Sequence, residues 1–520
     1  MISRHNIRVI AHHVFRAIYM LAVYIYRVLR FLFRPLFHAH PRIYRFATAL
    51  REAGKELIRP PEIIPPPIFP DPVRVIFPEE TTPGDKGEAL SPESEQKPPV
   101  PSWLRDEWRE IHAIEPQLFP EQWLTENISS YHIPSTRIAE PYLELCRLYG
   151  DDVSHVFLVP WLVRGGADLV TLNYVRLLTE EHLAGHIVVI ATLNTDSPWQ
   201  ERLPENVRFI EFGKMYDFLS SEEQEKLFIK LLLQMGPQVI HNINSDLGYR
   251  VFAKYGKTLV TVSKLYASSF CFDYTEEGRT VGYGVWYLAK CFEFLEAILS
   301  DNHAHLEKLR EIYAFDKQKM YVNYQPAPPV STRRKYDETD LNKTPLDILW
   351  AGRLDRQKRP DILIELAKKC ENLPFKFYVY GSSLLDMDIY TRAFEESGNI
   401  IYCGAFNGLP SLPVEQYDVF LHTSQWDGLP NVLLESTALG LPIIASDVGG
   451  ISELIRHEDT GFLVDPYDDA DRYVLCLQEI YNNRSLLASI AGNAYQLISS
   501  RHSWNAFGEN VRHIPHYTYR

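Results

Sequence analysis

Two carboxylates, Asp427 and Glu435, stand eight positions apart in a stretch that changes from loop to helix. Gly428 and Pro430 favour a turn, and Asn431 is a suitable cap for the helix expected to follow. Backbone N–H groups at the beginning of a helix attract anionic or oxygen-rich ligands, and carboxylates accept hydrogen bonds from sugar hydroxyls. The stretch therefore predicts a binding site for a nucleotide linked to a sugar.

Two cations precede these carboxylates in the sequence. Arg353 follows Gly352 at the end of an apolar run, and Lys358 lies just before a helix expected to begin near Pro360. Two fixed cations can hold a diphosphate and stabilise the charge that it gains as a leaving group. A solvated surface pair would have the same spacing. The position after an expected strand and ahead of Asp427 favours the ligand site.

A pair of glycines, Gly165 and Gly166, marks a third turn, after an apolar run and before a helix expected over Leu169–Leu178. Glycines at that place let the backbone approach a ligand at the helix N-terminus. A tight strand–helix turn without a ligand would use the same residues. The motifs of the second half of the chain favour the ligand.

The elements that must position these residues alternate between short apolar runs and longer amphipathic ones. Several runs are apolar on both faces, which is typical of parallel strands covered by helices. Two series of such units predict an α/β protein with two doubly wound domains, which bind ligands at the carboxyl ends of their strands in a shared cleft. The first series of strands is expected at His155–Trp161, His186–Thr192, Val207–Phe212, Gln238–Ile243, Thr258–Val262, Ala297–Ser300 and Met320–Asn323. The second is expected at Leu346–Ala351, Phe375–Tyr380, Ile400–Cys403, Val419–Leu421 and Pro442–Ala445.

Composition sets the expected domain boundaries. Residues 1–58 are expected to form a basic amphipathic helix, and residues 59–101, which contain thirteen prolines, a Pro-rich linker. Residues 102–325 would form an N-terminal Rossmann-like acceptor domain. Residues 326–520 would form a C-terminal Rossmann-like donor domain. A return of its last helix to the first domain is compatible with this division.

The first segment is unusually basic for a chain whose formal net charge is −14, because residues 1–51 hold nine arginines and no acidic residue. Its longest uncharged run, Ala17–Tyr26, has ten residues, whereas a membrane span needs about 20. Four arginines share one narrow stripe of the helix: Arg16, Arg27, Arg30 and Arg34. We therefore expect a cytoplasmic protein held peripherally on the anionic inner face of the cell membrane. A helix docked on the protein's own surface and an organelle transit peptide are the alternatives.

Other ligand classes receive less support. The body of the chain lacks a broad basic field, so nucleic acid is not an expected partner. The six cysteines are scattered without metal-like spacing and are expected to be reduced thiols. Asp386 and Asp388 have an Asp-x-Asp spacing, but a solvated loop pair is the expected role, so neither a metal nor another cofactor is predicted.

Together the motifs resemble those of family 4 of the retaining glycosyltransferases with the GT-B fold, of the type that builds bacterial envelope polysaccharides. The matching pieces are Gly-Gly-Ala-Asp at 165–168, Gly-Arg-Leu-x-x-x-Lys at 352–358, the acid and Glu at 427 and 435, Gly-Gly-x-x-Glu at 449–453 and Thr-Gly-Phe-Leu-Val at 460–464. The resemblance is stronger in the second domain than in the first. Asp427 departs from the pattern, because the family normally has Glu there.

The resemblance implies roles for the residues of the donor side. Arg353 and Lys358, after Gly352, would bind the diphosphate, and Glu435 would bind the ribose hydroxyls. Asp427 would bind the transferred sugar. The turn that follows would offer backbone amides to that sugar: Gly428, Leu429, Pro430 and Asn431.

In the first domain, the resemblance implies that Gly165 and Gly166 lie close to the donor phosphates. The family also has a histidine of the catalytic region near the fourth strand of this domain. His241 is the nearest candidate for it, with a structural histidine at the strand end as the alternative.

The predicted activity is that of a retaining, metal-independent glycosyltransferase. It would move a hexose-type sugar from a nucleoside-diphosphate sugar to a saccharide or lipid-linked glycan acceptor. No carboxylate nucleophile is evident, so the acceptor hydroxyl would enter on the face that the diphosphate leaves. The alternatives are a nucleotide-sugar epimerase or glycan phosphorylase on the same fold, and a carbohydrate-binding or scaffold protein in which Asp427 marks lost activity.

Overall fold

The computed structural model describes residues 102–120, 137–150, 152–338, 340–382 and 387–519. The helix predicted over residues 1–58, the Pro-rich linker of residues 59–101 and Asp386 lie outside the described residues. The chain divides into two compact units, residues 1–135 and 136–520. Within the described ranges, no helix is long and apolar enough to cross a membrane.

In the first unit, the described residues form helix α4 (Ser102–Ile114) and the turn after it. Trp108 closes the turn, because its Nε1 donates a hydrogen bond of 3.2 Å to the carbonyl of Pro120. Its ring meets that of Phe119 edge to face, with the centroids 5.5 Å apart.

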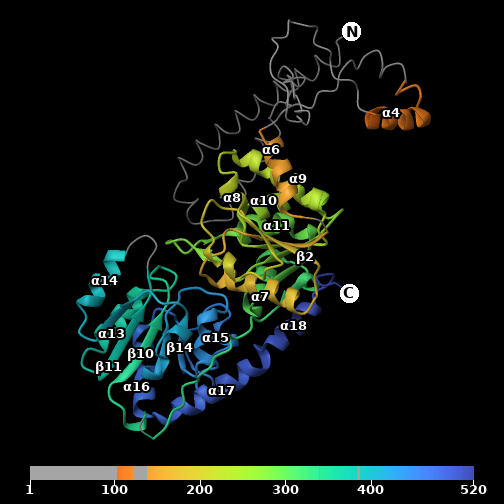
Figure 1. Ribbon diagram of the computed structural model, residues 1–520. Coiled ribbons are helices and arrows are strands. Elements are labelled where there is room, and N and C mark those ends of the chain that lie inside the picture. The colour runs from red at the N-terminus through yellow and green to blue at the C-terminus, as the bar shows by residue number, and fades with distance from the viewer. Residues whose placement is uncertain (1–101, 121–136, 151, 339, 383–386, 520) are drawn as a thin grey trace, which may run out of the picture. The chain divides into compact units, whose positions relative to one another are not determined.

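The second unit contains two parallel sheets, each with helices on both faces (Figure 1). The first sheet has seven strands in the order β3-β2-β1-β4-β5-β8-β9, and all neighbouring pairs are parallel. The strands are β1 (Val153–Val159), β2 (His186–Ala191), β3 (Arg208–Ile210), β4 (Val239–Ile243), β5 (Lys264–Ser268), β8 (Leu295–Ser300) and β9 (Met320–Val322). A short antiparallel hairpin follows β5 and consists of β6 (Asp273–Tyr274) and β7 (Thr280–Val281).

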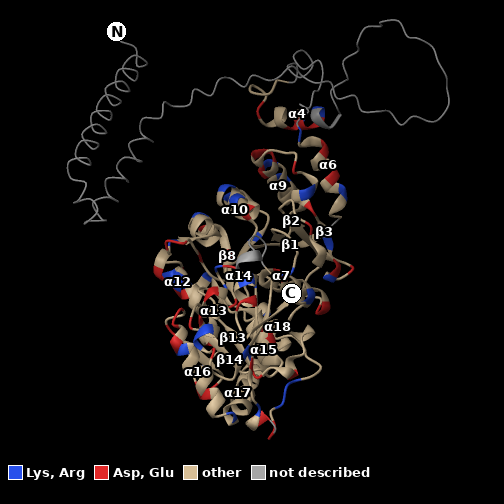
Figure 2. Ribbon diagram, turned by 90° about the vertical axis from the view of Figure 1, so that its left-hand side faces the viewer, with Lys and Arg blue, Asp and Glu red and all other residues tan. Residues whose placement is uncertain are grey.

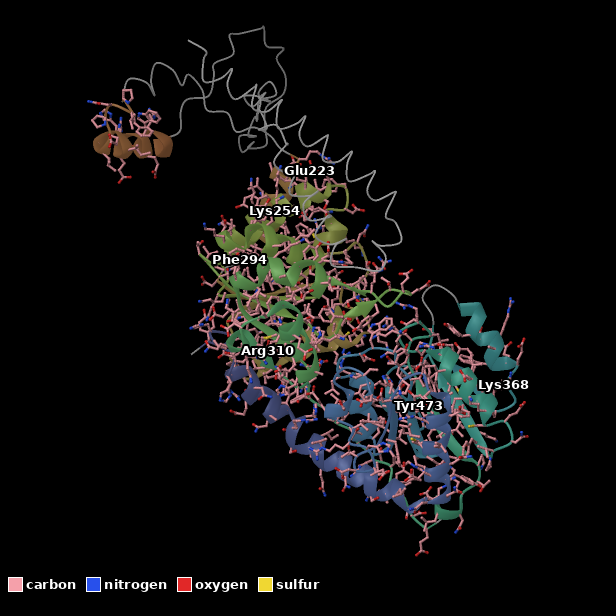
Figure 3. The ribbon with its side chains drawn as sticks, turned by 180° about the vertical axis from the view of Figure 1, so that it is seen from behind. Glu223, Lys254, Phe294, Arg310, Lys368 and Tyr473 are labelled. Carbon is pink, nitrogen blue, oxygen red and sulfur yellow. The ribbon has the colours of Figure 1, made fainter. Side chains whose placement is uncertain are left out.

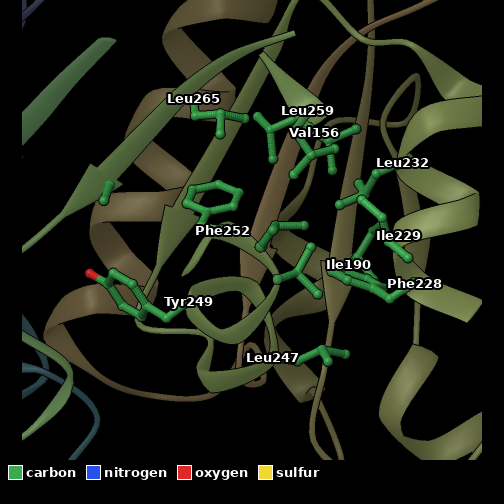
Figure 4. Packing of buried hydrophobic residues seen from close by; sticks show 14 of the residues in the cluster. Val156, Ile190, Phe228, Ile229, Leu232, Leu247, Tyr249, Phe252, Leu259 and Leu265 are labelled. Atoms are coloured by element: carbon green, nitrogen blue, oxygen red, sulfur yellow. The ribbon is translucent and has the colours of Figure 1, made fainter. Parts of the chain in front are cut away.

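Alternate residues of β1 face opposite layers of helices, as the two-residue period of a strand requires. Val156 packs on one side with the first layer, and Phe157 on the other with the second. The first layer comprises α6 (Ala139–Leu148), α9 (Ser221–Met235), α10 (Asp246–Leu259) and α12 (His303–Tyr313). The second comprises α7 (Gly166–Glu180) and α18 (Trp504–Arg512). Figure 4 shows the packing of the first layer, where Phe228 and Phe252 lie among Val156, Ile190 and Leu265.

The second sheet has six parallel strands in the order β12-β11-β10-β13-β14-β15. They are β10 (Leu346–Ala351), β11 (Phe375–Tyr380), β12 (Ile400–Gly404), β13 (Val419–His422), β14 (Ile443–Ser446) and β15 (Phe462–Val464). Its helices are α13 (Pro360–Lys369), α14 (Met387–Glu395), α15 (Asn431–Ala438), α16 (Ala470–Asn482) and α17 (Ser485–Arg501). The core on the α13 and α16 face includes Tyr473, which Figure 3 labels.

Shorter helical segments join these elements. They are α8 (Phe212–Met215), α11 (Ala289–Cys291), a π-helical turn at Gly284–Leu288 and 3-10 turns at Pro198–Arg202, Phe292–Phe294, Lys317–Lys319, Asp340–Asn342, Leu409–Ser411, Val414–Gln416 and Ile451–Glu453. Lys, Arg, Asp and Glu are distributed over the helices of both sheets (Figure 2).

The order of each sheet reverses beside its first strand, so that β1 neighbours β4 and β10 neighbours β13. In doubly wound folds the loops at this switch point form the ligand crevice. The prediction of an α/β protein with two Rossmann-like domains of the GT-B type is confirmed by this arrangement.

One predicted strand, Thr258–Val262, is wrong. Helix α10 continues to Leu259, and Val260 and Val262 are exposed in the turn that follows it. The strand that pairs with β4 is β5, Lys264–Ser268, which begins with an exposed lysine. A short run of β-branched residues therefore marked the end of a helix, and local composition cannot separate these two cases. The edge strand β15 was not predicted as a strand, although its residues belong to a motif quoted above.

The chain crosses back to the first sheet at its end. Phe507 and Val511 of α18 are buried in the core of the first sheet. After α18, the carbonyl of Tyr517 accepts a hydrogen bond of 2.8 Å from Nε2 of His155. A second tie between the sheets is Glu453, whose Oε1 accepts from the amide of Ala304, the second residue of α12, at 2.9 Å.

A buried ion network supports the second sheet at the end opposite to the switch point. Asp418, immediately before β13, is fully buried and lies 3.0 Å from Arg334, 3.1 Å from Lys343 and 3.1 Å from Arg484. Its Oδ2 also accepts from the amide of Asp347 at 2.9 Å. The network joins the segment before β10, which carries Arg334 and Lys343, to β10, β13 and the start of α17.

Candidate active site

The loops that follow β10 and β13 meet at the switch point of the second sheet. Thr423, the residue after β13, accepts a hydrogen bond of 3.0 Å from Nε1 of Trp350 and donates one of 2.8 Å to the carbonyl of Lys358. The amide of Gln425 donates to the carbonyl of Gln357 at 2.8 Å. These bonds fix the two loops side by side.

Asp427 is the centre of a polar cluster between these loops. Its Oδ2 lies 2.5 Å from Nζ of Lys358, accepts from Oγ of Ser424 at 3.0 Å and lies 3.3 Å from Nε2 of His422. Only 14% of the Lys358 side chain and 12% of the Asp427 side chain is exposed. The structure therefore brings together two residues that the sequence separates by almost seventy positions.

The electrostatics of the cluster keep Asp427 ionised. Burial by itself would raise the pKa of this carboxyl, but Lys358 and the hydrogen bond from His422 outweigh it and lower the pKa well below its ordinary value. The pKa of His422 is lowered by burial, which exceeds the opposing effect of Asp427. The cluster thus holds one carboxylate and one ammonium group beside a histidine whose neutral form is favoured.

Arg353 does not join this cluster. One of its terminal nitrogens lies 3.2 Å from Oδ2 of Asp355, and the other donates to Oε1 of Gln357 at 2.6 Å. Its side chain is 57% exposed. Gly352 before it ends the strand by donating its amide to the carbonyl of Tyr380 at 3.0 Å. Of the two cations that the sequence singled out in this loop, Lys358 is largely buried and Arg353 is exposed.

Helix α15 begins at Asn431, and its N-cap is Pro430, which has no side chain that caps the helix. The prediction of Asn431 as the cap is therefore wrong by one position. The side chain of Asn431 reaches the first domain instead, where its Nδ2 donates to the carbonyl of Gly166 at 3.3 Å. The beginning of α15 and the glycine turn of the first domain thus lie next to each other.

Glu435 lies one turn further along α15. Its Oε2 accepts from the amide of Leu409 at 2.9 Å. Burial raises the pKa of this carboxyl, against the opposing effects of Leu409 and of Arg164 from the first domain. The Arg164 guanidinium itself lies over the ring of Phe406, 4.7 Å from its centroid. Glu435 is therefore close to both domains.

The turn at Gly165 and Gly166 opens α7, with Gly165 as an extended N-cap and Gly166 as the first helical residue. Asp168 in the first turn is buried, and its Oδ1 accepts from the amide of Val163 at 3.1 Å. Burial raises the pKa of Asp168 to about 6, and the hydrogen bonds oppose that rise. A Cβ atom at position 165 would lie 2.5 Å from Oδ2 of Asp168, so a side chain there would force the Asp168 carboxylate to shift.

His241 lies in the core of the first sheet. Its side chain is fully buried in β4, with Nδ1 2.7 Å from the hydroxyl of Tyr517 and Nε2 2.8 Å from Oγ of Ser268. Burial lowers its pKa to about 3. Both ring nitrogens of His241 therefore have hydrogen-bond partners within the core of the first sheet.

Sequence reasoning missed Asp301, which contacts the 427–431 turn from the first domain. Asp301 directly follows β8 and accepts from the amide of Leu429 through Oδ2 at 3.4 Å. Burial raises its pKa to about 7, against the hydrogen bonds from Asn302 and Leu429, and the nearby Asp427 adds to the rise. The available signal was its position at a strand end, which it shares with the residues that were predicted.

The β6–β7 hairpin supplies a second missed contact. The Nε1 of Trp426 donates to Oδ1 of Asp273 at 3.3 Å, and the guanidinium of Arg356 stacks on the Trp426 ring at 4.8 Å. Arg356 also donates to the carbonyl of Thr275 at 3.0 Å. The residue before Asp427 is therefore anchored to the first domain.

The two doubly wound domains, joined by contacts at their switch points, define a protein of the GT-B class. Within it, residues 331–497 match the family of glycosyl transferases group 1. This region contains the predicted donor-side residues of the second domain, from Gly352 to Glu435. The match confirms the broader prediction of a glycosyltransferase, made from the sequence alone.

The relatives and solved structures are distant. The chain is 24% identical over 356 residues to an Escherichia coli UDP-Gal:alpha-D-GlcNAc-diphosphoundecaprenol alpha-1,3-galactosyltransferase, which covers 64% of this chain and 89% of the relative. It is 33% identical over 128 residues to the Escherichia coli O-antigen biosynthesis glycosyltransferase WbnH, covering 25% and 36% of the two chains. The crystal structure of Anabaena HepE in complex with UDP and glucose superimposes with a TM-score of 0.54 and 17% identity, covering 69% of this chain and 98% of that one. That last likeness concerns the fold.

Proposed function

We propose that this protein is a retaining glycosyltransferase that moves a hexose-type sugar from a nucleoside-diphosphate sugar to a saccharide or lipid-linked glycan. The observation that carries the proposal is the contact between Lys358 and Asp427 at the switch point of the second sheet. A buried cation that can meet a diphosphate and a carboxylate that can meet a sugar stand next to each other there. Glu435, one helical turn into α15, adds a second carboxylate that can accept hydrogen bonds from the donor.

The donor would lie across the beginning of α15. Lys358 and the exposed Arg353 would bind its diphosphate from the second domain, and the turn at Gly165 and Gly166 would approach it from the first. The contact between Asn431 and the carbonyl of Gly166 supports a site that both domains share. The Glu435 carboxylate would accept hydrogen bonds from the ribose hydroxyls.

The reaction would need no co-substrate other than the sugar donor and the glycan acceptor. The bond between the anomeric carbon and the diphosphate oxygen breaks, and the acceptor hydroxyl oxygen forms the new bond on the same face. Its proton passes to an oxygen of the departing diphosphate, whose charge Lys358 and Arg353 stabilise. Asp427 would orient the sugar hydroxyls during this exchange. The use of these two cations supports a metal-independent reaction.

The acceptor would be a glycan or glycolipid of the bacterial envelope at the inner face of the membrane. The arginine-rich residues 1–58 and the proline-rich residues 59–101 support this part of the proposal. So does the Escherichia coli relative whose name includes a diphosphoundecaprenol-linked acceptor.

Lys358→Ala tests the proposed function. Sugar transfer from a nucleotide sugar should fall by about a thousandfold, because one preorganised charge-stabilising group is worth about that factor. Lys369→Ala is the matched control, since Lys369 is exposed on α13 and pairs with Asp471 at 2.7 Å. Thermal shifts with UDP, GDP, ADP and their sugars identify the donor to use. Unchanged transfer by Lys358→Ala would contradict the proposal.

The same assay separates the alternatives. An epimerase would convert the nucleotide sugar without releasing a nucleoside diphosphate, and a phosphorylase would require free phosphate. A carbohydrate-binding scaffold would keep its function in the cell when Lys358 is replaced by Ala. Each of these results would replace the proposed activity.

A further inference from the structure

Asp301 belongs to the first domain but contacts the second. It follows the last residue of β8 and is only 8% exposed. Its Oδ2 accepts the hydrogen bond from the amide of Leu429, in the turn that precedes α15. A carboxylate from one domain therefore binds the backbone of the other at the proposed donor site.

Asn302 holds the Asp301 carboxylate in place from behind. Its Nδ2 donates to Oδ1 of Asp301 at 2.6 Å and to the carbonyl of Phe270 at 3.0 Å. Its own Oδ1 accepts from the amide of His305 at 2.8 Å, which makes it the N-cap of α12. Asn302 is fully buried, so α12 and the end of β8 fix the direction of the Asp301 side chain.

The turn that Asp301 contacts has little room to move. A Cβ atom at Gly428 would lie 3.0 Å from Oδ1 of Asp301 and 3.0 Å from the carbonyl oxygen of Phe270. On the other side, the carbonyl of Gly428 accepts from the amide of Gly450 at 3.0 Å. The Gly428–Leu429 turn is thus held between strand ends of the first domain and the Gly449–Gly450 turn of the second.

We propose that Asp301 is a positioning residue, which holds the Gly428–Leu429 turn from the opposite domain in the place where the turn receives the donor sugar. This inference rests on the proposed function, in which that turn offers backbone amides to the sugar. Asp301 acts through Leu429 and does not itself touch the donor. The groups proposed for the diphosphate and the ribose, Lys358 and Glu435, make their recorded hydrogen bonds with other partners.

The position of the turn matters for the sugar half of the donor and not for its nucleotide half. Loss of the Asp301 contact should therefore weaken the binding of an intact nucleotide sugar more than that of the free nucleoside diphosphate. A general disturbance of the fold would weaken both alike. This difference separates a positioning role from a structural one.

The experiment compares Asp301→Ala, Asp301→Asn and Glu307→Gln in the full chain. Glu307 is the matched control, because it is an exposed residue of α12 that pairs with Arg310. For each variant we would measure the KM of the nucleotide sugar that the wild type uses and the inhibition constant of the matching nucleoside diphosphate. Circular dichroism and thermal unfolding report whether each variant is folded.

Asp301→Ala should raise the KM of the nucleotide sugar about tenfold, the usual effect of losing one hydrogen bond to a charged acceptor. The inhibition constant of the nucleoside diphosphate should change less than about twofold, within the effect of a distant substitution. Asp301→Asn should restore most of the loss, because its amide oxygen can still accept from Leu429. If Asp301→Ala does not fold, Asp301→Ser serves in its place, since its hydroxyl is too short to reach the same amide.

Equal loss for both ligands, or no change for either, would overturn the positioning role of Asp301. Failure of the Asn variant to restore the KM would also overturn it. A wild-type protein that binds neither the nucleotide sugars nor the nucleoside diphosphates would contradict the proposed function instead. The two failures are therefore distinguishable.

Discussion

The ammonium nitrogen of Lys358 lies 2.5 Å from Oδ2 of Asp427, in surroundings that expose no more than 14% of either side chain. Such a pair differs from a surface salt bridge, because removal of one partner leaves an uncompensated charge in a poorly solvated place. The same oxygen of Asp427 also meets Ser424 and His422. Lys358 is thus held in place before a donor arrives, and its position is set by the carboxylate that is proposed to bind the sugar.

This pairing predicts a strong energetic coupling between the two residues. Lys358→Met or Asp427→Asn alone should lower the free energy of unfolding by about 3 kcal/mol, because each leaves a buried charge unpaired. The double variant should lose much less than the sum of the two, with a coupling free energy above about 1 kcal/mol. Denaturant unfolding of the four proteins measures this cycle. Additive losses would show that the pair contributes nothing as a pair.

The raised pKa of Asp301 predicts that the stability of the folded protein depends on pH. Its pKa is raised from 3.8 to about 7 in the folded protein, mainly by burial. The folded state therefore binds this proton more tightly than the unfolded state, and the free energy of unfolding falls as pH rises between these two values. The fall should approach about 1.4 kcal/mol per pH unit near the middle of this range.

The comparison with Asp301→Asn isolates this titration, because the amide does not ionise. The stability of the wild type relative to this variant should be greatest at about pH 4 and should decline as pH rises through about 7. Equilibrium unfolding at several pH values measures the difference. A difference that stays constant over this range would contradict the raised pKa of Asp301.

Much of the fold could be predicted because parallel strands buried on both faces are distinct in the sequence. The runs at Leu346–Ala351 and Phe375–Tyr380 coincide with β10 and β11. The strand predicted at Thr258–Val262 was wrong, because exposed valines just after a helix have the same composition as a strand. The location of Asp427 and Glu435 at the switch point of the second sheet could also be expected, because ligand-binding loops follow strand ends in this class of fold.

The contacts between domains could not be predicted from the sequence. Nothing in the sequence around Asp301 indicates a contact with Leu429, because that contact depends on how the two sheets and their loops pack against each other. The core position of His241 depends on Tyr517, which reaches it only after the chain has crossed back to the first sheet. Sequence patterns report burial and periodicity within an element, and these contacts depend on the packing of distant elements.

The ion network around Asp418 predicts a large loss of stability when this residue, which lies far from the candidate active site, is replaced. Three cations surround this fully buried carboxylate, and Asp418→Ala would leave them without their common partner. The free energy of unfolding should fall by about 3–5 kcal/mol. Thermal or denaturant unfolding measures the change, and Asp471→Ala, at an exposed position, is the control. A loss no larger than that of the control would show that the network is not a stabilising one.

The proposed use of Lys358 and Arg353 predicts that transfer does not depend on a divalent metal. Treatment with a chelator, followed by assay in chelator, should leave the rate within about twofold of the untreated rate, because the cations that stabilise the leaving diphosphate belong to the protein. Arg353→Ala should then reduce turnover less than Lys358→Ala, since Arg353 is the more exposed of the two. Loss of transfer in chelator with recovery on adding Mg²⁺ or Mn²⁺ would contradict metal independence.

The arginine-rich segment predicts where the protein acts. The full chain should sediment with vesicles that contain phosphatidylglycerol, and residues 59–520 alone should stay in the supernatant. Higher salt should release the full chain, because screening shortens the range of surface charges from about 10 Å at 0.1 M to about 3 Å at 1 M. Transfer to a soluble acceptor should not change on deletion, whereas transfer to a lipid-linked acceptor in vesicles should decline. Vesicle binding by residues 59–520 would instead place the membrane contact in the globular body, because the arginines would then be dispensable.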